Sequence, residues 1–188
     1  MGASASARPA LALASFALTG HITPMHSSPL RIGVAGVGHF GRYHALKVAA
    51  SPRAVLAGVF DPNSARALAV SEEARAPVVD WASLLELSDA LVIAAPADVH
   101  HALTAAALRA GKHVLVEKPI AATMPQADEL VALAGERKLV LQVGHLERFS
   151  AAFAAMEGRL GAPLYIEATR IAPFKPRGTD VSVILDLM

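Results

Sequence analysis

The sequence predicts an α/β fold built around a doubly wound parallel sheet. A short β-branched segment, Arg31 to Ala35, stands directly before a glycine-rich turn and a helical pattern from His44 to Ala50. Strand-like and helical segments then alternate as far as residue 143, and the run Ala90 to Ala95 is apolar throughout. Such a run is typical of a central parallel strand covered on both faces, and right-handed crossovers between such strands give the doubly wound arrangement.

The glycine-rich turn is Gly36-x-Gly38-x-x-Gly41, with His39 and Phe40 between its last two glycines. In a phosphate-binding turn, Gly36 permits the tight bend, Gly38 lets a pyrophosphate approach the backbone, and Gly41 lets the helix pack closely. The unpaired N–H groups at the helix start would then face the anion. Glycine-rich turns also occur for packing reasons, so the strand before and the helix after the motif are what predict a dinucleotide site.

Asp61 ends the second predicted strand, 54–60, and lies 20 residues after Gly41. An acidic residue at this place binds the ribose 2′-hydroxyl in dinucleotide-binding folds, although Asp61 could instead cap the helix that follows. No basic residue follows it immediately to hold a 2′-phosphate, which favours NAD over NADP as the cofactor.

The remaining elements follow in order along the chain. Asn63 or Ser64 is expected to cap a helix that runs to about Arg75, Asp98 to cap a later helix, and Gly111 to end that helix. We predict further helices at 81–87, 99–110, 124–138 and 148–160, further strands at 77–79, 113–117, 139–143 and 164–172, and a loop at 173–179.

The chain divides into three predicted parts. Residues 1–29, rich in Ala, Ser and Pro, form a disordered leader or a misassigned start, because Met25 stands shortly before the first strand. Residues 30–145 form the dinucleotide-binding domain, and residues 146–188 begin a second α/β domain that they do not complete. The apolar stretch 9–18 resembles a weak signal peptide, but it is too short to span a bilayer and lacks paired arginines, so we expect a cytoplasmic protein.

Composition excludes several classes of function. The net charge is +1 and no run of Lys or Arg stands out, so we expect no nucleic-acid or membrane partner. The absence of cysteine excludes disulfides and thiolate chemistry. The eight histidines are scattered, and the neighbours His100 and His101 point roughly 100° apart on a helix, so no metal site is predicted. The expected partners are a small molecule and further copies of the chain.

Glu117-Lys118-Pro119 stands at the end of the strand 113–117, at the sheet edge where ligands bind in open α/β folds. A lysine there can exchange a proton with a substrate hydroxyl during hydride transfer, whereas an isolated Glu-Lys-Pro would more simply be a surface turn. Together with the glycine turn, the stretches 94–100 and 111–119 closely resemble the signature of the Gfo/Idh/MocA oxidoreductase family. In that family a Rossmann domain precedes an open-sheet α/β domain that forms the substrate site and the oligomer contacts.

This resemblance implies a role for several residues. Lys118 matches the catalytic or nicotinamide-orienting lysine, and Glu117 lies against the cofactor. The loop that lines the dinucleotide is matched by Ala95, Pro96 and His100. The Lys118-Pro119 bond resembles one that is often cis in the family.

Residues 142–149 together with 180–188 resemble the subgroup that acts on UDP-N-acetylglucosamine and related nucleotide sugars. The subgroup implies that Arg148 lies near the sugar nucleotide, although a surface charge at a helix start is an equal alternative. His145, just past a strand, is as consistent with a residue at a domain junction as with a substrate contact.

The implied activity is NAD-dependent oxidation of a secondary alcohol of a sugar or nucleotide sugar. Family members carry a further aspartate and histidine on the helix after the position of Asp186-Leu187-Met188, and these 188 residues do not include them. We therefore expect little turnover from these residues alone, because positioning and water exclusion supply much of the rate. A non-catalytic dinucleotide-binding remnant is the alternative, and Glu117-Lys118-Pro119 disfavours a Rossmann methyltransferase.

Overall fold

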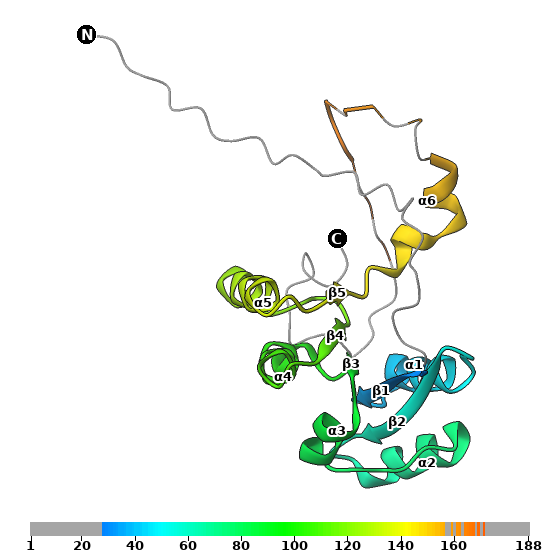
Figure 1. Ribbon diagram of the computed structural model, residues 1–188. Helices are drawn as coiled ribbons and strands as arrows, with labels where there is room; N and C mark the ends of the chain where they lie inside the picture. Colours follow the sequence, from blue (N-terminus) through cyan, green and yellow to red (C-terminus); the bar gives the residue numbers. More distant parts are fainter. Residues whose placement is uncertain are drawn as a thin grey trace.

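The computed structural model describes residues 28–156, 159, 161, 162, 164–167, 169 and 171. In this part of the chain a five-stranded parallel sheet has the order β2-β1-β3-β4-β5 (Figure 1). The strands are β1 (Leu30–Ala35), β2 (Ala54–Phe60), β3 (Ala90–Ile93), β4 (His113–Val116) and β5 (Leu141–Val143). The helices are α1 (His39–Ala49), α2 (Ser64–Ala74), α3 (Trp81–Leu87), α4 (Ala97–Arg109), α5 (Met124–Glu136) and α6 (Ala151–Met156), with a 3₁₀ helix, η1, at Leu146–Phe149. The predicted doubly wound α/β fold is confirmed.

Helices cover both faces of the sheet because successive side chains of each strand point to opposite faces. In β3, Val92 packs with the side chains that α1 and α2 bring to one face, whereas Leu91 and Ile93 pack with those of α3, α4 and α5 on the other. Strands β1, β3 and β4 are therefore apolar on both sides, as the continuous apolar run of β3 predicted.

Local signals in the sequence account for several helix ends. Asn63 accepts a hydrogen bond of 3.0 Å from the backbone N–H of Arg66 and caps α2, as predicted. Gly111 follows α4 with a φ of 76°, which confirms its predicted place at the helix end. The predicted cap at Asp98 is wrong, because α4 begins at Ala97 with Pro96 before it. Proline already holds the backbone angle that a helix start requires, and Asp98 lies in the first turn instead.

Other boundaries differ from the predictions for identifiable reasons. Helix α1 begins at His39 rather than His44, because Gly41 is part of the helix. The predicted strand at 77–79 is only a single bridge between Val59 and Val78. Strand β5 begins at Leu141 because Lys138, with a φ of 54°, and the bond from the Leu139 N–H to the Ala134 carbonyl complete the end of α5.

The segment after β5 departs most from the predictions. Instead of one helix at 148–160 there are η1 and α6, separated by Ser150, whose hydroxyl accepts a hydrogen bond from the Phe153 N–H and starts the new helix. No strand forms among the described residues of 164–172, where Leu164 and Tyr165 are 104% and 80% exposed. A strand requires a neighbouring strand, and the described residues supply none there. The loop predicted at 173–179 and nearly all of the leader predicted at 1–29 lie outside the described residues.

None of the helices in the described part of the chain is long and apolar enough to cross a lipid bilayer.

Candidate functional site

The loops that follow the five strands lie side by side at the carboxyl edge of the sheet. Backbone hydrogen bonds of 2.8 Å continue the strand pairing into these loops, from the Gly36 N–H to the Phe60 carbonyl and from the Glu117 N–H to the Ile93 carbonyl. Two more, also 2.8 Å, join Ala94 to Ala35 and Gly144 to Val116. In the order of the strands, this edge therefore brings together Asp61, the glycine turn (residues 36–41), Ala95, Glu117-Lys118 and Gly144-His145.

The three glycines of the turn have different surroundings. Gly36 has a φ of 81°, and a Cβ there would lie 2.5 Å from the Ala95 nitrogen, so the turn can bend only at a glycine. A Cβ on Gly41 would lie 1.8 Å from the Gly36 carbonyl oxygen, which shows how closely the first turn of α1 packs. A Cβ on Gly38 would meet no atom within 4 Å.

The open space at Gly38 adjoins the start of α1. Gly38 caps this helix without a side chain, so no side chain of the cap takes up the first N–H groups of the helix. An uncapped helix start beside a glycine in open space is suited to a phosphate group. His39 and Phe40 lie in the same first turn with exposed side chains. The residues present here therefore fit the pyrophosphate of a dinucleotide.

Asp61 lies at the end of β2 and is 8% exposed. Its Oδ2 accepts a hydrogen bond of 2.9 Å from the backbone N–H of Val37 in the glycine turn, and its Oδ1 accepts one of 2.9 Å from the N–H of Asn63. The guanidinium of Arg66, on α2, lies 3.3 Å from Oδ2. No basic residue follows Asp61 immediately in the sequence, but Arg66 reaches the carboxylate from α2. The neighbours of Asp61 in the sequence are therefore not sufficient to favour NAD over NADP.

Glu117 and Lys118 follow β4 directly, and the Lys118-Pro119 bond is cis, as the family resemblance implied. Glu117 is 6% exposed, and its Oε1 accepts a hydrogen bond of 2.7 Å from Nε2 of His44 on α1. Burial raises the pKa of the Glu117 carboxyl. The hydrogen bond and charge of His44, together with the backbone N–H and charge of Lys118, outweigh this effect and hold the pKa below its ordinary value.

His100 lies on α4 and is 1% exposed. Its Nδ1 lies 2.7 Å from the Pro119 carbonyl oxygen and its Nε2 lies 2.8 Å from the Ala95 carbonyl oxygen. Both polar atoms of the ring are therefore used within the protein, between the loop after β3 and the loop after β4. Ala95 is half-buried and Pro96 is exposed in the first of these loops, where the resemblance expects the dinucleotide.

His145 and Arg148 are exposed on the segment after β5. His145 follows Gly144 at the carboxyl edge, whereas Arg148 lies further along in η1. Among the described residues, no three histidine, aspartate or glutamate side chains come together as a set of metal ligands.

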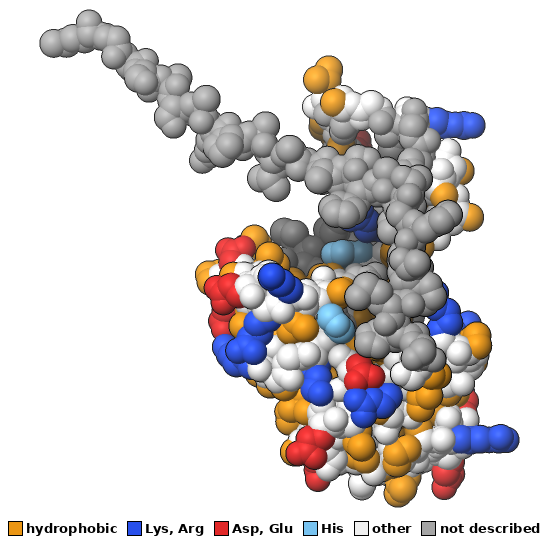
Figure 2. All heavy atoms as spheres, in the orientation of Figure 1, with side chains coloured by type: hydrophobic (Ala, Val, Ile, Leu, Met, Phe, Trp, Pro, Cys, Tyr) orange, Lys and Arg blue, Asp and Glu red, His pale blue; other side chains and the backbone are white. Residues whose placement is uncertain are grey.

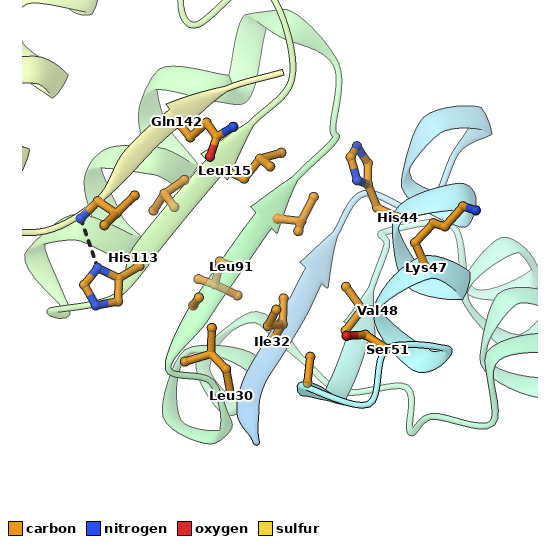
Figure 3. Close-up of a pocket in the computed structure, with 15 residues that line it drawn as sticks. Leu30, Ile32, His44, Lys47, Val48, Ser51, Leu91, His113, Leu115 and Gln142 are labelled. Atoms are coloured by element: carbon orange, nitrogen blue, oxygen red, sulfur yellow. Dashed lines mark hydrogen bonds between the residues drawn. The ribbon is translucent and has the colours of Figure 1, made fainter. Parts of the chain in front are cut away.

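A separate apolar hollow lies on the sheet face beside α1 (Figure 3). Leu30 and Ile32 of β1, with Leu115 of β4 and Gln142 of β5, face His44 and Val48 across it. This hollow lies along the strands and not at their carboxyl edge. Figure 2 shows Lys, Arg, Asp and Glu side chains interspersed on the visible face, with no broad area of one sign.

Three residues of the site were missed at the level of sequence: His44, Arg66 and Gly144. His44 falls on the helical repeat that contains Gly41, Ala45 and Val48, so a polar residue among sheet-facing positions was the available signal. A Cβ on Gly144 would lie 2.9 Å from Oε2 of Glu117, so this glycine leaves room for that carboxylate.

Similarity to known proteins agrees with this geometry. The family model described as "Oxidoreductase family, NAD-binding Rossmann fold" (GFO_IDH_MocA) matches residues 30–145. UDP-N-acetylglucosamine 3-dehydrogenase of Acidithiobacillus ferrooxidans is 47% identical over 163 residues, which are 85% of this chain and 51% of that protein. Inositol 2-dehydrogenase 1 of Saccharopolyspora erythraea is 35% identical over 150 residues, 73% of this chain and 44% of that protein.

Solved structures show the same relationship. The structure of UDP-N-acetylglucosamine 3-dehydrogenase GnnA from Acidithiobacillus ferrooxidans matches with a TM-score of 0.76 and 45% identity, over 85% of this chain and 53% of that chain. GenD2 from gentamicin A biosynthesis, in complex with NAD, matches with a TM-score of 0.66 and 30% identity, over 68% of this chain and 38% of that chain.

The chain thus spans about half the length of the curated relatives it matches. The matched region contains the glycine turn, Asp61 and Lys118, and it carries the parallel sheet on which these residues meet. The chain belongs to the Gfo/Idh/MocA oxidoreductase family, and residues 30–145 are its NAD-binding Rossmann region.

Proposed function

We propose that this chain supplies the coenzyme half of a dehydrogenase that oxidises a secondary alcohol of a nucleotide sugar of the UDP-N-acetylglucosamine kind. The observation that carries the proposal is the arrangement of loops at the carboxyl edge. Half-buried Lys118 follows β4 there, between the glycine turn after β1 and the exposed His145 after β5 in the order of the strands. A coenzyme laid along this edge would reach from Asp61 to Lys118.

The coenzyme would be held from three sides. Its pyrophosphate would lie at Gly38 against the first turn of α1, with Gly36 and Gly41 shaping the turn and His39 and Phe40 beside it. Asp61 would accept a hydrogen bond from the adenosine ribose. The residues that would line the nicotinamide end are Ala95, Pro96, Glu117 and Lys118, with His100 holding their loops together.

Lys118 would handle the proton of the reaction. Bound NAD supplies the acceptor for the hydride that leaves the carbon carrying the hydroxyl group. In the oxidising direction Nζ of Lys118 would accept the hydroxyl proton as the carbonyl forms, and in the reducing direction it would return that proton to the oxygen. The half-buried amine at the end of a strand is suited to this, because the buried strand holds its backbone in place.

The class of substrate is proposed from the relatives and from the segment after β5. The relative with 47% identity is named for UDP-N-acetylglucosamine, and the inositol relative for a polyol alcohol. Exposed Arg148 would meet the diphosphate of the sugar nucleotide, since a guanidinium binds phosphate oxygens in pairs, and His145 would lie nearer the sugar. The reaction would take place in the cytoplasm, and the whole enzyme would assemble from several copies.

Coenzyme binding can be tested on the chain itself by calorimetric titration with NADH. Gly38→Ala is expected to weaken NADH binding at least about tenfold, because its methyl group enters the space proposed for the pyrophosphate, while the free energy of unfolding stays close to that of the wild type. Gly135→Ala is the matched control, since a Cβ there also meets no atom within 4 Å but lies on α5. Equal NADH binding by both variants would remove the proposed phosphate site.

Turnover requires the other half of the enzyme. A chimaera that joins residues 1–188 to the remaining half of the Acidithiobacillus ferrooxidans relative is expected to form NADH from NAD and UDP-N-acetylglucosamine. Lys118→Ala should lower its kcat about 100-fold or more, as for the loss of a general acid or base. Undiminished turnover in Lys118→Ala would assign the proton to another group. NADH binding by the chain without turnover by the chimaera would favour the dinucleotide-binding remnant.

A further inference from the structure

Two histidines from different helices hold the residues on either side of Lys118. His44 on α1 donates to the carboxylate of Glu117, the residue before Lys118, across 2.7 Å. His100 on α4 lies 2.7 Å from the carbonyl oxygen of Pro119, the residue after Lys118. The helices belong to opposite faces of the sheet, so the Glu117-Lys118-Pro119 segment is held from both sides.

The His44 contact is partly buried, and the carboxylate charge of Glu117 strengthens it. The side chains of His44 and Glu117 are 20% and 8% exposed, and Oε2 of the same carboxylate accepts a hydrogen bond of 3.3 Å from the backbone N–H of Lys118. Glu117 therefore connects the ring of His44 to the backbone of Lys118 through its two oxygens. Gly144 packs against this carboxylate, because a Cβ at Gly144 would lie 2.9 Å from its Oε2.

The His100 contact joins two loops. Its ring lies between the carbonyl oxygens of Pro119 and Ala95, 2.7 Å and 2.8 Å from its two nitrogens. Carbonyl oxygens only accept hydrogen bonds, so a ring that carries both protons satisfies both partners and a neutral ring satisfies one. No ring polar atom is left to contact a ligand, so His100 can influence the coenzyme only through these loops.

We propose that His44 and His100 are positioning residues that fix Lys118 relative to the phosphate-binding turn, with His44 acting through the carboxylate of Glu117. This inference rests on the proposed function, since it assumes that the coenzyme lies between the glycine turn and Lys118. Its physical basis is that α1 begins at the glycine turn and carries His44 one turn later. One rigid helix thus links the pyrophosphate end of the coenzyme to the lysine at the nicotinamide end.

Two ligands separate positioning from a general structural effect. NADH reaches the nicotinamide end, whereas ADP-ribose ends before it, and both bind through the same phosphate turn. In the 188-residue chain, His44→Ala is expected to weaken NADH binding about tenfold, as for the loss of one charged hydrogen bond. The affinity for ADP-ribose should stay within about twofold of the wild-type value. His44→Gln keeps an N–H donor at a similar reach and should restore most of the NADH affinity.

A double variant tests whether His44 acts through the lysine. In a Lys118→Ala background, His44→Ala should weaken NADH no further, because the side chain that it positions is absent. His100→Leu, which can donate to neither carbonyl oxygen, should behave as His44→Ala does in both backgrounds. His101→Ala is the matched control, because His101 also pairs with a glutamate, Glu129 at 3.0 Å, but on the outer surface of α4 and α5, and it should change neither affinity.

The outcomes distinguish this inference from the proposed function. A wild-type chain that binds neither ligand overturns the proposed function and the inference with it. A wild-type chain that binds both, with a His44→Ala loss that is equal for NADH and ADP-ribose or fully additive with Lys118→Ala, overturns the positioning role and leaves the coenzyme site in place.

Discussion

The carboxylate of Asp61 accepts a hydrogen bond of 2.9 Å from the backbone N–H of Val37, which ties the end of β2 to the glycine turn after β1. The bond is buried, and Val37 is 1% exposed. Asp61 therefore holds the backbone of the glycine turn, in addition to the ribose contact proposed for it.

Asp61→Ala should consequently have two effects. The free energy of unfolding should fall by about 1–3 kcal/mol, because the buried Val37 N–H loses its acceptor. NADH binding should weaken about tenfold or more through loss of the ribose contact. Denaturant unfolding and calorimetric titration measure the two separately, and Asp61→Asn, which keeps an acceptor oxygen, should retain more of the stability. NADH affinity that is unchanged in Asp61→Ala would remove the ribose assignment.

Gly41→Ala should destabilise the fold itself. The added Cβ would lie 1.8 Å from the Gly36 carbonyl oxygen, which is backbone and cannot turn aside as a flexible side chain would. Overpacking of this kind costs roughly 1–3 kcal/mol. Thermal unfolding of Gly41→Ala beside Gly135→Ala checks this, since Gly135 lies on α5 in open space and should gain slightly from alanine. Equal melting temperatures would contradict the close packing of α1.

Gly144→Ala should move the side chain of Glu117 and leave the glycine turn unchanged. Its Cβ would lie 2.9 Å from Oε2 of Glu117 and would force that carboxylate to move from the backbone of Lys118. NADH is expected to bind roughly three- to tenfold more weakly while ADP-ribose binds as before. The comparison of the two ligands by calorimetry is the measurement, and a matching loss for both would point to general damage.

The free energy of unfolding should depend on pH through the ion pair of Arg31 and Asp89, which lies at the amino ends of β1 and β3. The Asp89 carboxylate accepts hydrogen bonds of 3.0 and 3.1 Å from the backbone N–H and the Nε of Arg31. The Arg31 guanidinium lowers the pKa of Asp89 to about 2. Because the folded pKa lies below the unfolded value, the pair stabilises the protein above about pH 4 and loses this effect as the pH falls toward 2.

Asp89→Asn should therefore lower the denaturation midpoint at pH 7 by a small amount, and this difference should shrink as the pH falls through about 2. The effect is small because the side chains of Arg31 and Asp89 are 52% and 37% exposed to water. Urea unfolding of both proteins across this pH range measures the difference. A gap between them that widens as the pH falls would reverse the sign and contradict the assignment.

Limited trypsin digestion should cut the chain at Arg148 in η1 or at Arg159 and leave the sheet domain intact. Arg148 and Arg159 are exposed, and so are the apolar side chains of Leu164, Ile166 and Ile171, none of which packs on the sheet. Mass spectrometry of the products is expected to show an early resistant fragment that ends between residues 144 and 161. Equal resistance of residues 164–188 would show that this segment is packed after all.

Much of the fold could be predicted because its strands carry strong and local signals. Ala54–Phe60 and Trp81–Leu87 have the predicted bounds, and the structure shows that Asp80 caps the second of these segments. The segment after Gly144 was predicted less well. Its pattern suggested a strand at 164–172, but pattern alone does not provide the neighbouring strand that such a segment requires.

The sequence predicted where Asp61 and Lys118 lie in the fold. It did not predict which side chains contact the residues of the candidate site. Asp61 and Lys118 were placed at the ends of strands, because the end of an apolar run is visible in the sequence. His44 and Glu117 lie 73 residues apart, and their contact depends on α1 and the end of β4 meeting across the sheet. Arg66 was missed because it does not follow Asp61 directly, yet it lies in the first turn of α2, which brings its guanidinium to the carboxylate.

Arg66 has a consequence for attempts to convert the coenzyme preference of this protein. Conversion from NAD to its phosphorylated counterpart usually demands both the removal of an acidic group and the introduction of a cation. Here the guanidinium already stands beside the acidic group, 3.3 Å away and half exposed. If the ribose assignment of Asp61 holds, shortening that one side chain would make room for a 2′-phosphate beside Arg66. The cost of this change would be the buried N–H of Val37, which would lose its acceptor.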